Sequence, residues 1–91
     1  MTEATLVVGH PLGLHARPAA DLYRKTREFK SRITIQNLSS PEGPELPVSP
    51  FNLLQIGVSH GHQVRLRAEG DDECEAIRAL AALIEQQSRG G

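Results

Sequence analysis

Aromatic residues are scarce in this short chain. Among its 91 residues there is no Trp, one Tyr and two Phe, so the core must be aliphatic. A core built from so few residues would have to be opened to hold a buried substrate pocket. We therefore expect one domain, residues 1–91, whose function lies at its surface.

Disulfides, membrane spans and export signals are also missing from the sequence. The single Cys, Cys74, excludes an internal disulfide and fits a reducing compartment. No apolar run approaches the ~20 residues that a bilayer span needs, and no signal-peptide pattern opens the chain. We expect a cytoplasmic protein without membrane insertion.

The net charge is only −1, so no overall field favours a nucleic-acid or membrane partner. The charges are nevertheless uneven. Residues 17–32 carry six basic side chains against Asp21 and Glu28, whereas residues 69–75 carry five acidic side chains and no basic one. Two interpretations stand: two solvated helix faces, or a basic docking patch for an acidic protein.

Periodicity predicts alternating strands and helices around a proline-rich connection. Alternation of apolar and polar residues and short apolar runs indicate strands at 5–8, 33–37 and 63–68. Apolar residues at steps of three and four indicate helices at 16–29 and after Gly70. Four prolines in residues 39–50 leave at most a short edge strand near Glu45. The order β-α-β-(β)-α-β-α predicts an α+β fold with helices on one face of an antiparallel sheet.

Ser49 followed by Pro50 is a strong signal for the start of a helix. The Ser hydroxyl can accept from a first-turn N–H, and Pro loses nothing at the first helical position. In the short helix that follows, we expect Leu53 and Ile56 to lie in the core and Phe51 to be exposed.

The last helix has a start signal of a different kind. Asp72 can cap it, and Glu75 follows three residues later, as in a capping box. Cys74 stands three residues before the apolar Ile77, so we expect its side chain to be half-buried.

The stretch Gly13-Leu14-His15-Ala16-Arg17-Pro18-Ala19-Ala20 carries the most chemistry. It lies where a loop becomes a helix, with His15 at or just before the first helical residue. The free N–H groups of Ala16 and Arg17, the positive helix end and the Arg17 guanidinium together predict an anion site. The positive helix end also disfavours a charged imidazole, and a neutral ring nitrogen can attack phosphorus. We interpret His15 as a phosphoryl acceptor; the alternative is a capping or solvated histidine.

Two further histidines, His60 and His62, flank Gly61 and could bind a metal with His10. No Cys or carboxylate completes a ligand set, so a turn before a strand is the favoured interpretation. We expect no metal and no cofactor.

Three motifs together resemble one family. The string GLHARPAA resembles the active-site motif of HPr, the histidine-containing phosphocarrier of the phosphoenolpyruvate-dependent sugar phosphotransferase system. SPFNLLQIG (49–57) resembles the family's second helix, and residues 68–73 resemble its last strand-to-helix turn. The resemblance covers nearly the whole chain. It implies an HPr-like open-faced β-sandwich, in which three helices cover one face of a four-stranded antiparallel sheet.

The resemblance also implies roles for single residues. His15 resembles the histidine that is phosphorylated at Nδ1, and Arg17 resembles the active-site arginine. Arg24, Arg27 and Phe51 resemble positions at the partner interface. By the same resemblance, Enzyme I donates the phosphoryl group and Enzyme IIA domains receive it. We expect a monomeric carrier.

Ser49 resembles a serine that HPr kinase/phosphorylase modifies in some bacteria, which makes it a candidate regulatory phosphosite. The sequence departs from the family pattern beside it, because Pro50 stands where members usually carry Ile or Leu. Residues 38–48 are also longer and richer in proline than usual. Both departures bear on kinase recognition and docking, and neither touches His15.

Two functions remain open on these residues. The chain is either a phosphoryl carrier, or a regulatory binding module of the same fold whose partner binding is switched by phosphorylation. His15 favours the carrier, because a purely regulatory relative could dispense with it. A free-standing enzyme is not indicated, since the sequence places no second acid/base group and no nucleotide-binding loop. The relay could be linked to a sugar, to dihydroxyacetone or to nitrogen.

Overall fold

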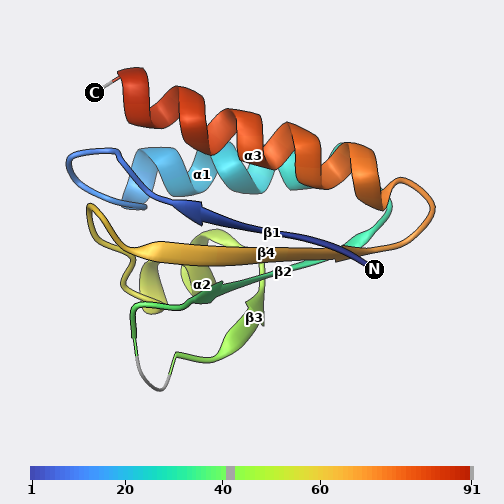
Figure 1. The fold of residues 1–91 in the computed structure, drawn as a ribbon, viewed down its shortest axis with the longest axis horizontal. Helices are drawn as coiled ribbons and strands as arrows, with labels where there is room; N and C mark the ends of the chain where they lie inside the picture. Colours follow the sequence, from blue (N-terminus) through green and yellow to red (C-terminus); the bar gives the residue numbers. More distant parts are fainter. Residues whose placement is uncertain (41–42, 91) are drawn as a thin grey trace.

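The computed structural model describes residues 1–40 and 43–90 of the chain. The elements in this part are β1 (Thr2–Val7), α1 (Ala16–Thr26), β2 (Arg32–Asn37), β3 (Glu45–Pro47), α2 (Pro50–Gln55), β4 (Gln63–Glu69) and α3 (Glu73–Gly90). The predicted order and the α+β class are confirmed (Figure 1). Pro41, one of the prolines of the predicted loop, lies outside the described residues.

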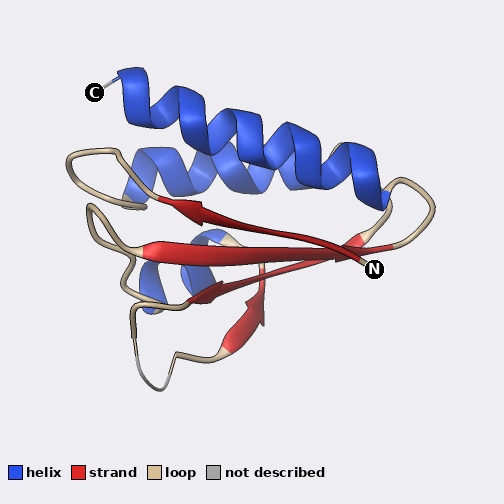
Figure 2. Cartoon of the chain, viewed as in Figure 1, coloured by secondary structure: helices blue, strands red, loops and turns tan. Residues whose placement is uncertain are grey.

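The four strands form one antiparallel sheet in the order β1-β4-β2-β3 (Figure 2). β4 is central to the pairing: it runs alongside β1 from Ala68 opposite Thr2 to Gln63 opposite Val7. On its other side it pairs with the whole of β2. β3 is the short edge strand that the proline content predicts, and it meets β2 at only three residue pairs.

The helices cover one face of this sheet, and the core lies between the two layers. Side chains alternate along a strand, so every second residue of β2 and β4 faces the helices. Helices α1 and α3 lie side by side over that face, as Figure 1 shows. The buried side chains are aliphatic, as predicted; the largest are Leu22, Ile35, Leu53, Leu66, Leu80 and Ile84.

Two element boundaries differ from the prediction by three residues each. β1 begins at Thr2, three residues earlier than expected, because its pairing with β4 extends to the chain start, where the side chains are mostly polar. α1 ends at Thr26 rather than Phe29. There the N–H groups of Glu28 and Phe29 donate to carbonyls three residues back, a tightening typical of a helix end.

The predicted capping box at the start of α3 is replaced by a tertiary contact. The Asp72 carboxylate accepts from the N–H groups of Lys30 and Ser31, at 2.8 and 3.0 Å, and from the Ser31 hydroxyl. It therefore joins the start of α3 to the turn before β2. The expectation for Cys74 was wrong: its side chain is exposed, since it falls outside the buried stripe of Ile77, Leu80 and Ile84.

In residues 1–40 and 43–90, no helix combines the length and the apolar composition that crossing a bilayer requires.

Candidate functional site

His15 is the N-cap residue of α1, with an extended backbone (φ −87°, ψ −167°). Its carbonyl accepts the first helical hydrogen bond, from the Ala19 N–H at 2.8 Å. The first-turn N–H groups, including those of Ala16 and Arg17, have no acceptor within a helix. The His15 side chain makes no capping bond to them. The imidazole is thus left free beside a row of unused donors and the positive end of the helix dipole.

The loop before His15 is held from both sides. Leu14 is buried, and its N–H donates to the Val58 carbonyl at 3.1 Å. Gly13 has φ +70°, and a Cβ there would lie 2.2 Å from the Val58 oxygen. Only glycine fits this close approach. The backbone that presents His15 is therefore fixed by packing against the segment after α2.

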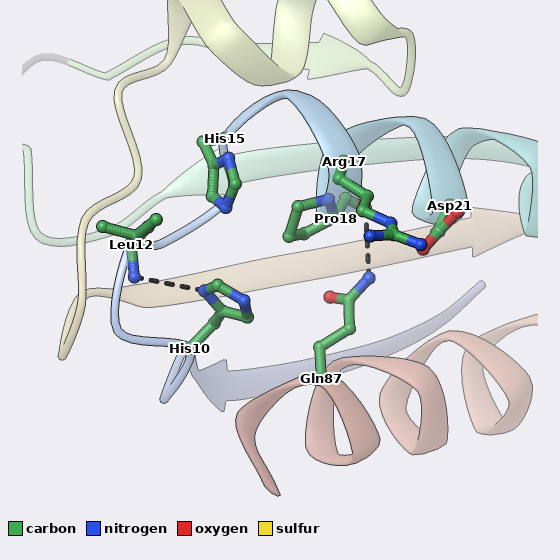
Figure 3. A pocket seen from close by; sticks show the side chains of 7 residues that line it. All are labelled: His10, Leu12, His15, Arg17, Pro18, Asp21 and Gln87. Atoms are coloured by element: carbon green, nitrogen blue, oxygen red, sulfur yellow. Dashed lines mark hydrogen bonds between the residues drawn. The ribbon is translucent and has the colours of Figure 1, made fainter. Parts of the chain in front are cut away.

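His15 and Arg17 line one cavity of about 390 Å³. Figure 3 shows the residues around it, which come from the loop after β1, from the first two turns of α1 and from the last turns of α3. They are His10, Leu12, His15, Arg17, Pro18, Asp21 and Gln87. The cavity offers the cationic fork of Arg17 and the imidazole nitrogens of His10 and His15, which is chemistry suited to an anion.

Of the seven lining residues, only His15 and Arg17 were predicted from the sequence as site residues, and His10 and Gln87 are two of those that were missed. His10 was considered only as a metal ligand, yet its ring centroid lies 5.2 Å from that of His15. Gln87 lies 72 residues further along the chain than His15, and its Nε2 donates to the Pro18 carbonyl at 3.1 Å. The helical pattern of α3 carries no sign of this contact, because it arises from the packing of α3 against α1.

Ser49 and Phe51 lie on α2 rather than in the cavity. Ser49 is the N-cap of α2, and its Oγ accepts from the Asn52 N–H at 3.1 Å, with Pro50 at the first helical position. The capping prediction is confirmed. Phe51 is 72% exposed, while Leu53 and Ile56 are buried, which is the predicted division between surface and core.

Arg24 and Arg27 lie near the opposite end of α1. At the helical rise per residue, they are roughly 12–16 Å along the axis from the first turn. Arg24 is ion-paired with Asp21, and the Arg27 guanidinium lies 5.8 Å from the centroid of the Tyr23 ring. Arg24 and Arg27 thus lie on one face of α1, at the end of the helix that is far from His15.

The two histidines beside Gly61, His60 and His62, belong to a turn in which the His62 N–H donates to the Ser59 carbonyl. His62 Nδ1 lies 3.1 Å from the Ser59 N–H, which donates to it, and 3.2 Å from the Asn37 side-chain amide. His60 is exposed. Within the described part of the chain, no three His, Cys, Asp or Glu side chains are grouped as a metal site would require.

Comparisons with known proteins point in one direction. A family model described as "PTS HPr component phosphorylation site" matches residues 2–86. The phosphocarrier protein HPr of Mycoplasma pneumoniae is 37% identical over 87 residues, which cover 94% of this chain and 96% of that protein. The multiphosphoryl transfer protein of Haemophilus influenzae is 38% identical over 80 residues, 88% of this chain but only 16% of that protein.

The fold comparison agrees with the sequence comparison. The crystal structure of HPr-C-His from Thermoanaerobacter tengcongensis is similar, with a TM-score of 0.86 and 39% identity. The match covers 98% of this chain and 97% of that one. The open-faced sheet with three helices on one side is therefore shared along nearly the whole length of both chains.

Proposed function

The chain belongs to the HPr family of phosphotransferase-system phosphocarriers, and on that premise we propose that His15 is the residue that carries its phosphoryl group. One observation supports this assignment most strongly. The His15 imidazole stands at the N-cap of α1 without a capping bond, in the same cavity as Arg17. His10 lies in this cavity too, but it is not at a helix N-terminus.

The proposed transfer requires no cofactor. A neutral ring nitrogen of His15, Nδ1 by analogy with the family, attacks phosphorus with its lone pair, while the ring proton stays on the other nitrogen. The bond from phosphorus to the donor atom breaks, and its electron pair leaves on the donor. The Arg17 guanidinium and the first-turn N–H groups then hold the phosphoryl oxygens. Reversal of these steps onto an acceptor completes the relay.

The partners follow from the family. We propose that Enzyme I is the donor and that Enzyme IIA domains are the acceptors. The protein would act as a cytoplasmic, monomeric, single-domain carrier and not as a free-standing enzyme. The match to one part of a multiphosphoryl transfer protein supports this place in a phosphoryl relay, since that protein's name assigns it phosphoryl transfer.

The site assignment is tested by substitution of His15. Wild type, His15→Ala and His60→Ala are each mixed with Enzyme I and phosphoenolpyruvate, and acid-labile, base-stable phosphate is measured. Wild type and His60→Ala, whose exposed histidine lies in the 59–62 turn, should accept one phosphoryl group. His15→Ala should accept none. Phosphate on His15→Ala would show that the acceptor is another residue.

A further inference from the structure

We propose that His10 is a second ligand of the phosphoryl group, donating a hydrogen bond from its Nε2–H to a phosphoryl oxygen carried on His15. This inference rests on the proposed role of His15 and adds a residue to it. His10 belongs to the loop after β1, outside the GLHARPAA string.

The first observation is the distance between the two rings. Their centroids are 5.2 Å apart, and the ring planes are inclined at 54°. Both side chains line the same cavity, and Figure 3 shows them on one side of it, opposite Gln87 and Arg17. A group attached to the His15 ring is therefore within reach of the His10 side chain.

The second observation defines which nitrogen of His10 is a donor. The Leu12 N–H donates to His10 Nδ1 at 3.1 Å, the dashed line to Leu12 in Figure 3. An acceptor nitrogen carries a lone pair, so the neutral ring holds its proton on Nε2. The backbone thus selects the tautomer whose remaining N–H is free to serve a ligand in the cavity.

The third observation is that two hydrogen bonds fix the loop that contains His10. The Gly9 N–H donates to Ser88 Oγ at 2.9 Å, which links the loop to α3. The Gly13 N–H donates to the His10 carbonyl, also at 2.9 Å. A donor fixed in advance needs little reorganisation when negative charge arrives, which is the condition for effective electrostatic stabilisation.

The other side chains that line the cavity do not make the His10 N–H donor redundant. On α1, Arg17 is the cation that lines the cavity, and the Asp21 carboxylate is paired with Arg24. α3 contributes the uncharged Gln87, whose Nε2 is used by the Pro18 carbonyl. Phosphoryl oxygens on His15 would thus be met by Arg17 from the helix and by His10 from the loop after β1.

The test measures how long the phosphoryl group survives. Wild type, His10→Ala, His10→Gln and the control His60→Ala are phosphorylated with Enzyme I, and hydrolysis of the phosphohistidine is followed after Enzyme I is removed. Loss of one hydrogen bond to a charged group should speed hydrolysis of His10→Ala by about 10- to 100-fold. His10→Gln keeps an N–H donor and should recover part of the lifetime, and His60→Ala should match wild type.

A second measurement needs no variant. In ¹⁵N-labelled wild type, phosphorylation of His15 should slow solvent exchange of the His10 Nε2 proton, because that proton becomes hydrogen-bonded. Equal phosphohistidine lifetimes in wild type and His10→Ala, or an unchanged exchange rate, would overturn the role of His10 alone. A wild-type protein that accepts no acid-labile phosphate from Enzyme I would overturn the role of His15 and this inference together.

Discussion

At the scale of single residues, we expect Arg17 to contribute to the rate of phosphoryl transfer and little to the stability of the fold. Its side chain is exposed and lines the cavity without packing into the core. We expect Arg17→Ala to slow transfer from Enzyme I by about 10- to 100-fold, the value of one charge-assisted hydrogen bond. Stability should change by only ~0–1 kcal/mol, as is usual for an exposed charge.

Quenched assays of the transfer rate from Enzyme I and urea unfolding of the same samples check both parts of this expectation. Arg17→Lys is the matched variant, since it keeps the charge and loses the planar fork. It should fall between wild type and Arg17→Ala. An Arg17→Ala protein that is destabilised but transfers normally once folded would contradict the assignment.

The residues of the site differ in how far they could be predicted. His15 and Arg17 are neighbours in one string, and their placement at a helix start follows from Gly13 and Pro18. Gln87 could not be predicted, because it reaches the Pro18 carbonyl only through the packing of two helices. His10 could not be assigned either, since nothing in the loop sequence shows how it folds back toward His15.

At the scale of elements, α2 depends on Ser49. Its Oγ accepts from the Asn52 N–H, one of the helix-start donors that would otherwise lack a partner. We expect Ser49→Ala to lower the free energy of unfolding by ~1 kcal/mol and Ser49→Asp to change it little, because Asp also caps. Urea unfolding of the three proteins measures this, and equal midpoints for Ser49→Ala and wild type would remove the cap from the account of α2.

The same residue is a proposed regulatory phosphosite. Negative charge at a helix N-terminus is favourable, so a phosphate there need not unfold the domain. It would instead place negative charge two residues from Phe51, which is a proposed partner-interface residue, and repel an acidic partner. We expect Ser49→Asp to be stable but to accept phosphate from Enzyme I much more slowly than wild type. Equal transfer rates would leave Ser49 with the capping role alone.

Helix α1 provides a test of the basic docking patch. Arg24 is already paired with Asp21, whereas the Arg27 guanidinium lies over the Tyr23 ring. Rim charges act mainly on association rate and salt dependence. Arg24→Glu with Arg27→Glu should therefore weaken Enzyme I binding and flatten its dependence on salt, with Arg27→Glu responsible for most of the effect. Unchanged binding of the double variant at low salt would rule out the patch.

At the scale of the whole molecule, the pattern of the sequence was enough for the order of elements and the layer arrangement. Two long-range contacts could not be predicted in this way: β1 pairs with β4, and Asp72 contacts Ser31. Each joins residues from distant parts of the chain, and periodicity within a segment carries no information about such partners. The Asp72 contact also shows why a local capping rule failed: the carboxylate accepts hydrogen bonds from the turn before β2 instead of from the first turn of α3.

Long-range contacts at one end of the molecule also predict its response to acid. The Thr2 hydroxyl, at 2.6 Å, and the Met1 amine, at 3.0 Å, both contact Glu73 Oε2, and the Gly70 N–H donates to the other oxygen. These groups, the Thr2 hydroxyl foremost, lower the pKa of Glu73 to about 2. The Ser31 hydroxyl and the backbone N–H groups lower the pKa of Asp72 as well.

Both carboxyls therefore bind protons more weakly in the folded state than in the unfolded chain, where the Glu73 pKa is 4.5. Their contribution to stability is complete above pH 4.5 and should be lost as pH falls toward about 2. Thermal unfolding of wild type should show this decline between those values. Glu73→Gln should be less stable than wild type at pH 6 and should lose less on acidification, while Glu75→Gln, which replaces an exposed carboxylate two residues further along the chain, should follow wild type. Parallel pH profiles for Glu73→Gln and wild type would show that the contacts of Met1 and Thr2 with Glu73 contribute nothing to stability.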